Sequence, residues 1–202
     1  MPSPGPNADP PEIARLRSDL LVDAQLHGRP MRFATTWGLF SPRGIDDGTR
    51  LLLDHFQAAP GDQSLDVGCG YGPIGLALAA DAPQGHATLV DRDFLAVEYA
   101  RRNAALNGLS NVTCRLGHGL EGLPAEARFD NVVSNLPAKT GGELLQVLLY
   151  DAWSRLRPGG RLCVVTVTGL RRFIERHMKA RFGNYDKLKQ NPRYTVAMAV
   201  RE

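Results

Sequence analysis

The stretch Leu65-Asp66-Val67-Gly68-Cys69-Gly70-Tyr71-Gly72-Pro73-Ile74-Gly75, "LDVGCGYGPIG", decides the fold. It begins as a short apolar run, passes through a glycine-rich turn and leads into the helix-forming run 73–81, "PIGLALAAD". A strand, a glycine loop and a helix in this order are typical of a site for a nucleotide-like cofactor, because the ligand lies at the helix amino terminus and at the carboxyl end of the sheet. Residues 70–75 also satisfy the dinucleotide pattern G-x-G-x-x-G, which is weak evidence alone.

Two aspartates indicate which class of ligand the glycine loop would bind. Asp66 comes just before the glycines, and its carboxylate would repel a pyrophosphate but attract a cationic amino-acid group. Asp91 ends the next strand-like run, roughly 20 residues after the loop, where a carboxylate can accept hydrogen bonds from a ribose. The alternative to a cofactor site is a purely structural one, a tight turn with two helix-capping aspartates. Motif, context and spacing together favour a cofactor site.

Outward from this stretch, strand-like runs alternate with helical runs. We expect strands at 64–68, 86–91, 112–116, 129–134 and 161–168, helices at 73–81, 93–108, 142–160 and 170–182, and a closing hairpin around Asn191-Pro192. This alternation predicts an α/β fold with a Rossmann-like, doubly wound, mostly parallel sheet, an antiparallel C-terminal hairpin and helices on both faces.

The amino-terminal part is organised differently. The opening residues, "MPSPGPNADPPE", are rich in proline and small polar residues, so 1–11 is expected to be a disordered tail. Helical spacing of apolar residues predicts an amphipathic helix over 12–27, and a second helix around 51–56 could be capped by Asp46 or Asp47. We therefore expect a single domain at 12–202, with a helical and loop extension at 12–60 and a cofactor-binding core at 61–202.

Composition excludes several classes of protein. The 202 residues are 43% hydrophobic and 22% charged, as in an ordinary soluble domain. No apolar run approaches the roughly 20 residues of a membrane span, and the amino terminus does not read as a signal peptide, so we expect a cytoplasmic protein with no membrane partner. The three cysteines contain no CxxC pair and are expected to be buried thiols without a redox or metal role.

The distribution of charge is more informative than its sum. The net charge is only +3, but residues 171–202 contain nine Lys or Arg (171, 172, 176, 179, 181, 187, 189, 193 and 201) against three acids (175, 186 and 202). A solvated helix face is the ordinary explanation of such a cluster. The cluster is also permissive for an anionic partner.

The segment 129–141, "FDNVVSNLPAKTG", ends a strand-like run on Asn135. Asn, Pro and Gly form turns for ordinary backbone reasons, so one interpretation is simply a turn. In the other interpretation, the Asn135 side-chain oxygen and the Leu136 carbonyl accept the hydrogens of a substrate amine. The residues of this segment leave both interpretations open.

Taken together, these segments resemble the class I S-adenosylmethionine-dependent methyltransferases, and most closely the small-domain group that includes ribosomal-RNA guanine-N2 methyltransferases. The resemblance runs from about Phe33 to the end and is carried by 38–53, 65–79, 90–108 and 129–141, of which the first and last are the more specific. It implies S-adenosylmethionine as cofactor, no metal, and an exocyclic amine of an RNA base as methyl acceptor.

The resemblance also implies roles for individual residues. The glycine loop would approach the cofactor with Gly68, Cys69, Gly70 and Gly72, and Asp66 would lie beside its amino-acid end. Asp91 would accept from the ribose hydroxyls, Arg92 would lie under the adenine, and His118 would lie beside the adenine amine. The family commonly has an acidic residue where this chain has His118, which could equally be a surface loop residue. Transfer itself would involve Asn135, Leu136 and Pro137.

The sequence departs from the family at the last motif. Where the family has Asn-Pro-Pro-aromatic, this chain has Asn135-Leu136-Pro137-Ala138, without the aromatic ring on which a flipped base would stack. Such a contact is worth about 1–3 kcal/mol. Trp37 or Phe40 is expected to replace it, with Lys139 as a further substrate contact.

We therefore favour methylation of guanine N2 in ribosomal RNA. The alternatives are a small-molecule or protein N-methyltransferase and a non-catalytic module that binds the cofactor or RNA. Larger relatives carry an additional RNA-docking domain. RNA binding by this chain would then depend on the basic carboxyl end, on a second subunit in a homodimer or on a partner protein.

Overall fold

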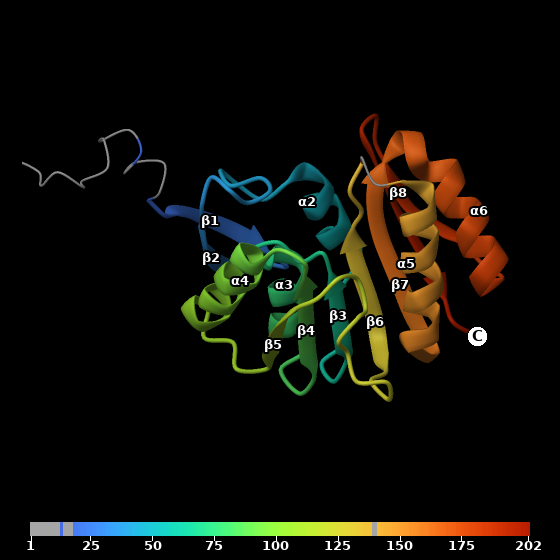
Figure 1. Ribbon diagram of the computed structural model, residues 1–202, viewed down its shortest axis with the longest axis horizontal. Coiled ribbons are helices and arrows are strands. Elements are labelled where there is room, and N and C mark those ends of the chain that lie inside the picture. Colours follow the sequence, from blue (N-terminus) through green and yellow to red (C-terminus); the bar gives the residue numbers. More distant parts are fainter. Residues whose placement is uncertain (1–12, 14–17, 139–140) are drawn as a thin grey trace, which may run out of the picture.

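The computed structural model describes residues 13, 18–138 and 141–202 and is built on a seven-stranded sheet (Figure 1). The strands of this sheet are β3 (Gln63–Val67), β4 (His86–Asp91), β5 (Val112–Leu116), β6 (Phe129–Asn135), β7 (Leu156–Val167), β8 (Asp186–Gln190) and β9 (Tyr194–Val200). Their order is β5-β4-β3-β6-β7-β9-β8. The first five are parallel, and β9 runs antiparallel to both β7 and β8. The predicted α/β fold with a closing hairpin is confirmed.

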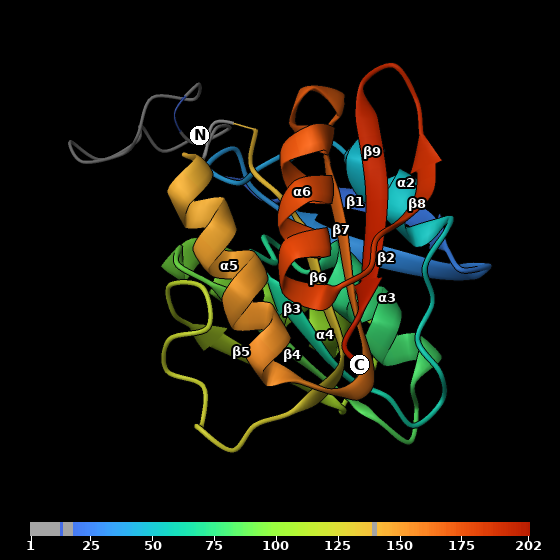
Figure 2. The ribbon, with the colours of Figure 1, turned by 90° about the vertical axis from the view of Figure 1, so that its right-hand side faces the viewer.

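Helices cover both faces of this sheet. They are α2 (Asp47–Leu53), α3 (Pro73–Asp81), α4 (Phe94–Leu106), α5 (Gly142–Arg155), the short 3₁₀ helix η1 (Thr168–Leu170) and α6 (Arg171–Phe182). The apolar sides of α2, α3 and α4 belong to one hydrophobic core and those of α5 and α6 to another, on the opposite face. Figure 2 shows α5 and α6 in front of the sheet. Within the described ranges, the helices are too short or too polar to cross a bilayer.

The predicted helix over 12–27 is wrong for its described carboxyl-terminal part. Strands β1 (Leu20–Leu26) and β2 (Arg29–Thr35) form an antiparallel hairpin instead. Val22 and Leu26 are buried whereas Leu21 is exposed, so the burial has a period of two. The two turn residues, His27 and Gly28, both have positive φ, which is the conformation of a tight two-residue hairpin turn.

The helix expected over 142–160 ends at Arg155. Pro158 has no backbone N–H, and the residue before a proline disfavours the helical conformation, so the chain leaves the helix early. Leu156 is fully buried and pairs with Phe129 at the start of β7. The Pro-Gly-Gly segment is therefore an irregular beginning of a strand. In the amino-terminal part, Asp46 caps α2, as expected, but this helix ends at Leu53.

Gly75→Ala is expected to destabilise the domain. A Cβ at Gly75 would lie 2.5 Å from Leu89 Cγ, because α3 packs closely on β4 at this point. Forcing an additional methyl group into such a packed core costs about 1–3 kcal/mol. Urea unfolding should report this decrease in the free energy of unfolding. Gly61→Ala is the matched control, since its Cβ would have no neighbour within 4 Å, and equal stability of both variants would contradict the prediction.

Candidate active site

A cavity of about 700 Å³ lies at the carboxyl ends of the parallel strands. Its wall is formed by the loop after β3, the end of β4, the loop 117–121, the end of β6, one side of α5 and part of the segment 39–49. This volume lies within the roughly 300–1,000 Å³ of small-molecule sites. The position is also the usual one for ligands of doubly wound sheets.

The glycine loop presents open backbone to this cavity. Gly68 and Gly70 have φ of +73° and +56°, a region that residues with a side chain rarely adopt, and a Cβ at either position would meet nothing within 4 Å. The backbone N–H groups of Gly68 and Cys69 both donate to the Val90 carbonyl, at 2.8 and 3.1 Å, which holds the loop against β4. The amino terminus of α3 lies next to the loop, and the positive end of its helix dipole favours an anionic ligand group.

Gly72 has a different role from the other two loop glycines. It is the amino-terminal cap of α3 with φ +99°, and a Cβ there would lie 3.0–3.3 Å from Leu76 and Leu89. Gly72 is not part of the cavity wall. Its positive φ serves the turn and its missing Cβ allows close packing, and its role in binding the cofactor stays a prediction.

Asp91 closes the loop on the side of β4. Its Oδ2 accepts from the Gly70 N–H at 2.8 Å and its Oδ1 from the Asp93 N–H at 2.9 Å. Each carboxylate oxygen has a second lone pair, so both can still accept from a ligand hydroxyl. Arg92 and His118 also line the cavity, and both are exposed.

Glu121 is a wall residue that sequence reasoning missed. Its N–H donates to the His118 carbonyl at 3.2 Å, so one turn brings both side chains to the same loop. The cavity wall thus contains an acidic residue, Glu121, beside His118. The only signal for this residue in the sequence is its position, because it is an acidic residue three positions after His118 in "HGLE".

Asp66 lies beneath the loop and outside the cavity wall. It is 1% exposed, and its Oδ2 accepts from the Gly75 N–H at 2.8 Å. Its Oδ1 is buried without a hydrogen-bond partner among the described residues. Burial raises the pKa of this carboxyl to about 7, and the nearby charge of Asp91 contributes in the same direction. Asp66 therefore supports the loop from behind, and its contact with a cofactor amino group stays a prediction.

This raised pKa leads to a pH prediction. Because the folded-state pKa of Asp66 lies above the unfolded value of 3.8, protonation favours the folded state. Its contribution is fully present below about pH 4 and is lost as the pH rises through about 7. The stability difference between the parent and Asp66→Asn, measured by urea unfolding, should therefore shift in favour of the variant between pH 4 and 7 and stay flat above 8. A pH-independent difference would contradict the assignment.

Asn135 is held in one orientation at the end of β6. Its Nδ2 donates to Asp46 Oδ2 at 2.9 Å and to Thr49 Oγ1 at 3.1 Å. A carboxylate only accepts hydrogen bonds, so the amide nitrogen must face Asp46. The amide oxygen accepts from none of the residues that the structure describes, and Asn135 lines the cavity. The backbone is fixed by the Leu136 N–H, which donates to the Val165 carbonyl at 2.9 Å.

Asp46 is the second residue that sequence reasoning missed, because it was read only as a helix cap. Its Oδ2 does cap α2, accepting from the N–H groups of Gly48 and Thr49 at 2.9 and 3.2 Å. The same carboxylate accepts from Asn135 and, through Oδ1, from the Tyr194 hydroxyl at 3.3 Å. One side chain thus connects the start of α2 with the end of β6 and the start of β9.

The candidate substrate residues separate into three groups. Phe40 lines the cavity and is 69% exposed. Trp37 is not part of the wall, and the Arg43 guanidinium lies 4.6 Å from the centre of its ring. Lys139 lies outside the described residues. The remaining predicted residues, Leu136 and Pro137, line the cavity beside Asn135.

The cysteines are free, buried thiols. Burial raises the pKa of Cys69 well above its usual value and that of Cys114 to about 11, and Cys163 shifts in the same direction. At neutral pH they remain protonated and are poor nucleophiles. Among the described residues, no group of three His, Cys, Asp or Glu side chains is placed to hold a metal ion.

Comparisons with known proteins agree with this geometry. The model of the methyltransferase small domain family matches residues 30–198. Ribosomal RNA small subunit methyltransferase C of Pseudomonas aeruginosa (strain LESB58) is 36% identical over 178 residues, which cover 83% of this chain and 53% of the relative. The uncharacterized protein YbxB of Bacillus subtilis is 32% identical over 142 residues, which cover 70% of this chain and 71% of that protein.

The solved structures include a similar domain. The 16S rRNA N2 methyltransferase RsmC of T. thermophilus, in complex with AdoMet and guanosine, superposes with a TM-score of 0.81 at 28% identity. The match covers 92% of this chain and 50% of that one. The chain thus spans about half the length of the ribosomal RNA methyltransferases that it matches.

Proposed function

Because the chain belongs to the methyltransferase small domain family, we propose that it transfers a methyl group from S-adenosylmethionine to an exocyclic amine of an RNA base, with guanine N2 of ribosomal RNA as the favoured target. The observation that carries this proposal is the fixed amide of Asn135 at the wall of the glycine-loop cavity, whose oxygen accepts no hydrogen bond from the described residues. The substrates named for the similar proteins support the choice of ribosomal RNA.

The glycine-loop side of the cavity fits S-adenosylmethionine. The backbone of Gly68 and Gly70 is open to a ligand, and the start of α3 favours its carboxylate. Asp91 has lone pairs left that would accept from the ribose hydroxyls, and Arg92, His118 and Glu121, which line the same cavity, would contact the adenine. The bound cofactor would supply a methyl group already activated by a positively charged sulfur.

The Asn135 side of the cavity would act on the acceptor amine. The lone pair of an exocyclic purine amine is delocalised into the ring, so the amine is a weak nucleophile. If Asn135 Oδ1 and the Leu136 carbonyl accepted its two hydrogens, the nitrogen would become pyramidal and its lone pair would be available to accept the activated methyl group. Alignment and fixed dipoles then provide the rate acceleration, and no metal is required.

Phe40 is the ring best placed to stack on the base in this chain. Ala138 provides no flat surface, and Trp37 lies outside the wall under Arg43. Tyr194 also lines the cavity but is tied to Asp46 by its hydroxyl. Phe40 is exposed at the cavity without a ring partner among the described residues, which suits a residue that covers an incoming base.

Mapping of modified nucleosides tests the acceptor. Ribosomal RNA from cells without the gene should lack one N2-methylguanosine, and the purified protein with S-adenosylmethionine should restore it. The departures at Leu136 and Ala138 from the family motif support a second candidate, methylation of a small-molecule or protein amine in the same cavity. Unchanged ribosomal and transfer RNA, together with methyl transfer to such an amine, would favour that candidate.

Binding measurements test the cofactor. Calorimetry should show binding of S-adenosylmethionine but not of NAD. Asp91→Ala should weaken this binding about 10- to 100-fold, because a hydrogen bond to a charged acceptor is worth about 1.5–3 kcal/mol and Gly70 also loses its partner. Asp186→Ala, an exposed carboxylate on the edge strand β8, is the control. A preference for NAD, or full affinity of the Asp91 variant, would contradict the assignment.

A further inference from the structure

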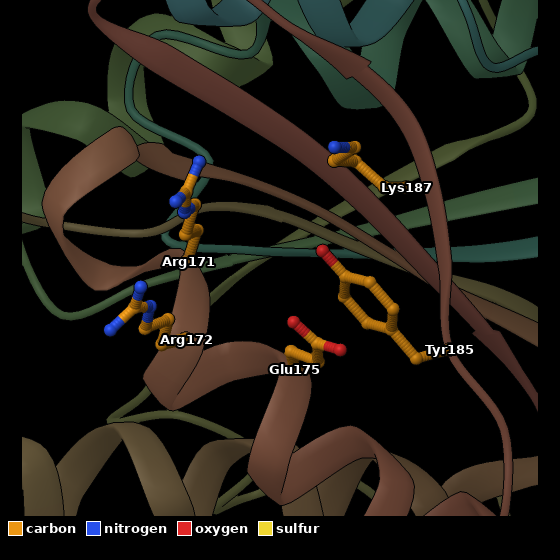
Figure 3. Close-up of a pocket in the computed structure, with 5 residues that line it drawn as sticks. All are labelled: Arg171, Arg172, Glu175, Tyr185 and Lys187. Atoms are coloured by element: carbon orange, nitrogen blue, oxygen red, sulfur yellow. The ribbon is translucent and has the colours of Figure 1, made fainter.

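We propose that a basic hollow between α6 and β8 binds the phosphate backbone of the RNA whose base enters the cavity; this inference rests on the proposed function. The hollow has a volume of about 310 Å³. Figure 3 shows the side chains around it: Arg171, Arg172, Glu175, Tyr185 and Lys187. Arg171 and Arg172 belong to the first turn of α6, whereas Tyr185 precedes β8 and Lys187 lies within it.

The hollow carries a net positive charge, from three cations and one acid. Its single acid, Glu175, already pairs with Lys179 at 2.6 Å, and this contact lowers the pKa of the carboxyl. Arg171 donates to the neutral Gln190 side chain at 3.3 Å. Within the part of the chain that the structure describes, no carboxylate forms an ion pair with Arg171, Arg172 or Lys187. Three cations are therefore available to an anionic ligand.

The hollow is connected to the cavity through the carboxyl end of β7, and it extends from there along the sheet to Lys187, which lies level with Val164 in the middle of β7. Val167, at the end of β7, lines the cavity, and η1 leads from it directly to Arg171. Thr168 fixes this connection to the hairpin, since its N–H donates to the Arg193 carbonyl at 2.8 Å and its hydroxyl to the Asn191 carbonyl at 3.1 Å. Strand β8 is separated from β6 by β7 and β9, which corresponds to about 14 Å.

The chemistry of the hollow fits single-stranded RNA. Such sites combine cations that follow the backbone with aromatic rings on which bases stack, and Tyr185 supplies a ring beside the three cations. Phosphate contacts of this kind fix the register of a nucleic acid without reading its sequence. The hollow would therefore hold the neighbouring nucleotides while the target base occupies the cavity. This arrangement gives the basic carboxyl end a specific role.

The salt dependence of RNA binding tests the proposal. The probe is a fluorescein-labelled 12-nucleotide oligouridine, and anisotropy gives its affinity for the parent and for R171Q/R172Q/K187Q between 0.05 and 0.5 M salt. For single strands, log K falls with log[salt] by about 0.7 per phosphate contact, so the slope of the triple variant should be shallower by about 2. At 0.1 M salt its affinity should be about a hundredfold lower.

A matched variant separates local contacts from net charge. R29Q/R115Q/R128Q removes the same charge from exposed residues outside the hollow and should retain the parental slope to within about one phosphate contact, 0.7. A parental slope in R171Q/R172Q/K187Q, or an equal decrease in both variants, would overturn the proposal. Binding of S-adenosylmethionine, measured on the same samples, should be unchanged in both. If the parent did not bind S-adenosylmethionine, the proposed function would be wrong. The salt dependence of oligouridine binding would still show whether the hollow binds RNA.

Discussion

Asn135→Ala is expected to lower the rate of methyl transfer by a factor of about 10² to 10³ and to leave the affinity for S-adenosylmethionine nearly unchanged. The amide oxygen of Asn135 would contact the attacking amine, whereas the cofactor contacts come from the glycine loop and Asp91 on the other side of the cavity. Removing an interaction that is made only in the transition state lowers kcat with little effect on ground-state binding.

The measurement is turnover on the identified substrate, normalised to the protein that binds cofactor in calorimetry. If Asn135 only shaped a turn, alanine would cost some stability and leave the turnover per folded molecule unchanged. Urea unfolding of the same variant separates these cases. Turnover within twofold of the parent would mean that Asn135 is scaffolding, and the catalytic assignment would be wrong.

The core of the fold could be predicted from the sequence because its signals are local. The glycine loop, the strand before it, the helix after it and the Asp93 cap of α4 are encoded within short windows, and the structure places them as expected. The hairpin β1–β2 was missed for the opposite reason. Its apolar residues fit a helical and an alternating pattern almost equally, and only the turn at His27 and Gly28 and the packing on the core decide between them.

Individual residues of the candidate site could be predicted from the sequence, but the hydrogen bonds between them could not. The motif positions identified Gly70, Asp91 and Asn135, and the structure brings them to one cavity. Asp46 and Asn135 are 89 positions apart, and nothing local in either segment indicates that they touch. For Asp66 the sequence predicts a position at the loop but cannot reveal that its side chain is buried.

Asp46→Ala is expected to lower turnover about 10- to 100-fold, as a positioning effect through Asn135. The hydrogen bond from Asn135 Nδ2 to the Asp46 carboxylate fixes which end of the amide faces the substrate. Hydrogen bonds to a charged partner are worth about 1.5–3 kcal/mol, and their loss allows the amide to rotate. The variant also loses the α2 cap, which costs about 1 kcal/mol of stability and is measured separately by urea unfolding.

A double-mutant cycle distinguishes positioning from stability. If Asp46 acts through Asn135, Asp46→Ala should have almost no effect on turnover in the Asn135→Ala background, because the two residues work as one unit. A purely structural effect would instead be additive. Asp46→Asn preserves the helix cap and keeps an oxygen for Asn135, so its turnover should lie between those of the parent and Asp46→Ala. Additive losses in the cycle, with no recovery in Asp46→Asn, would show that Asp46 is only a cap and that the orientation of Asn135 is set elsewhere.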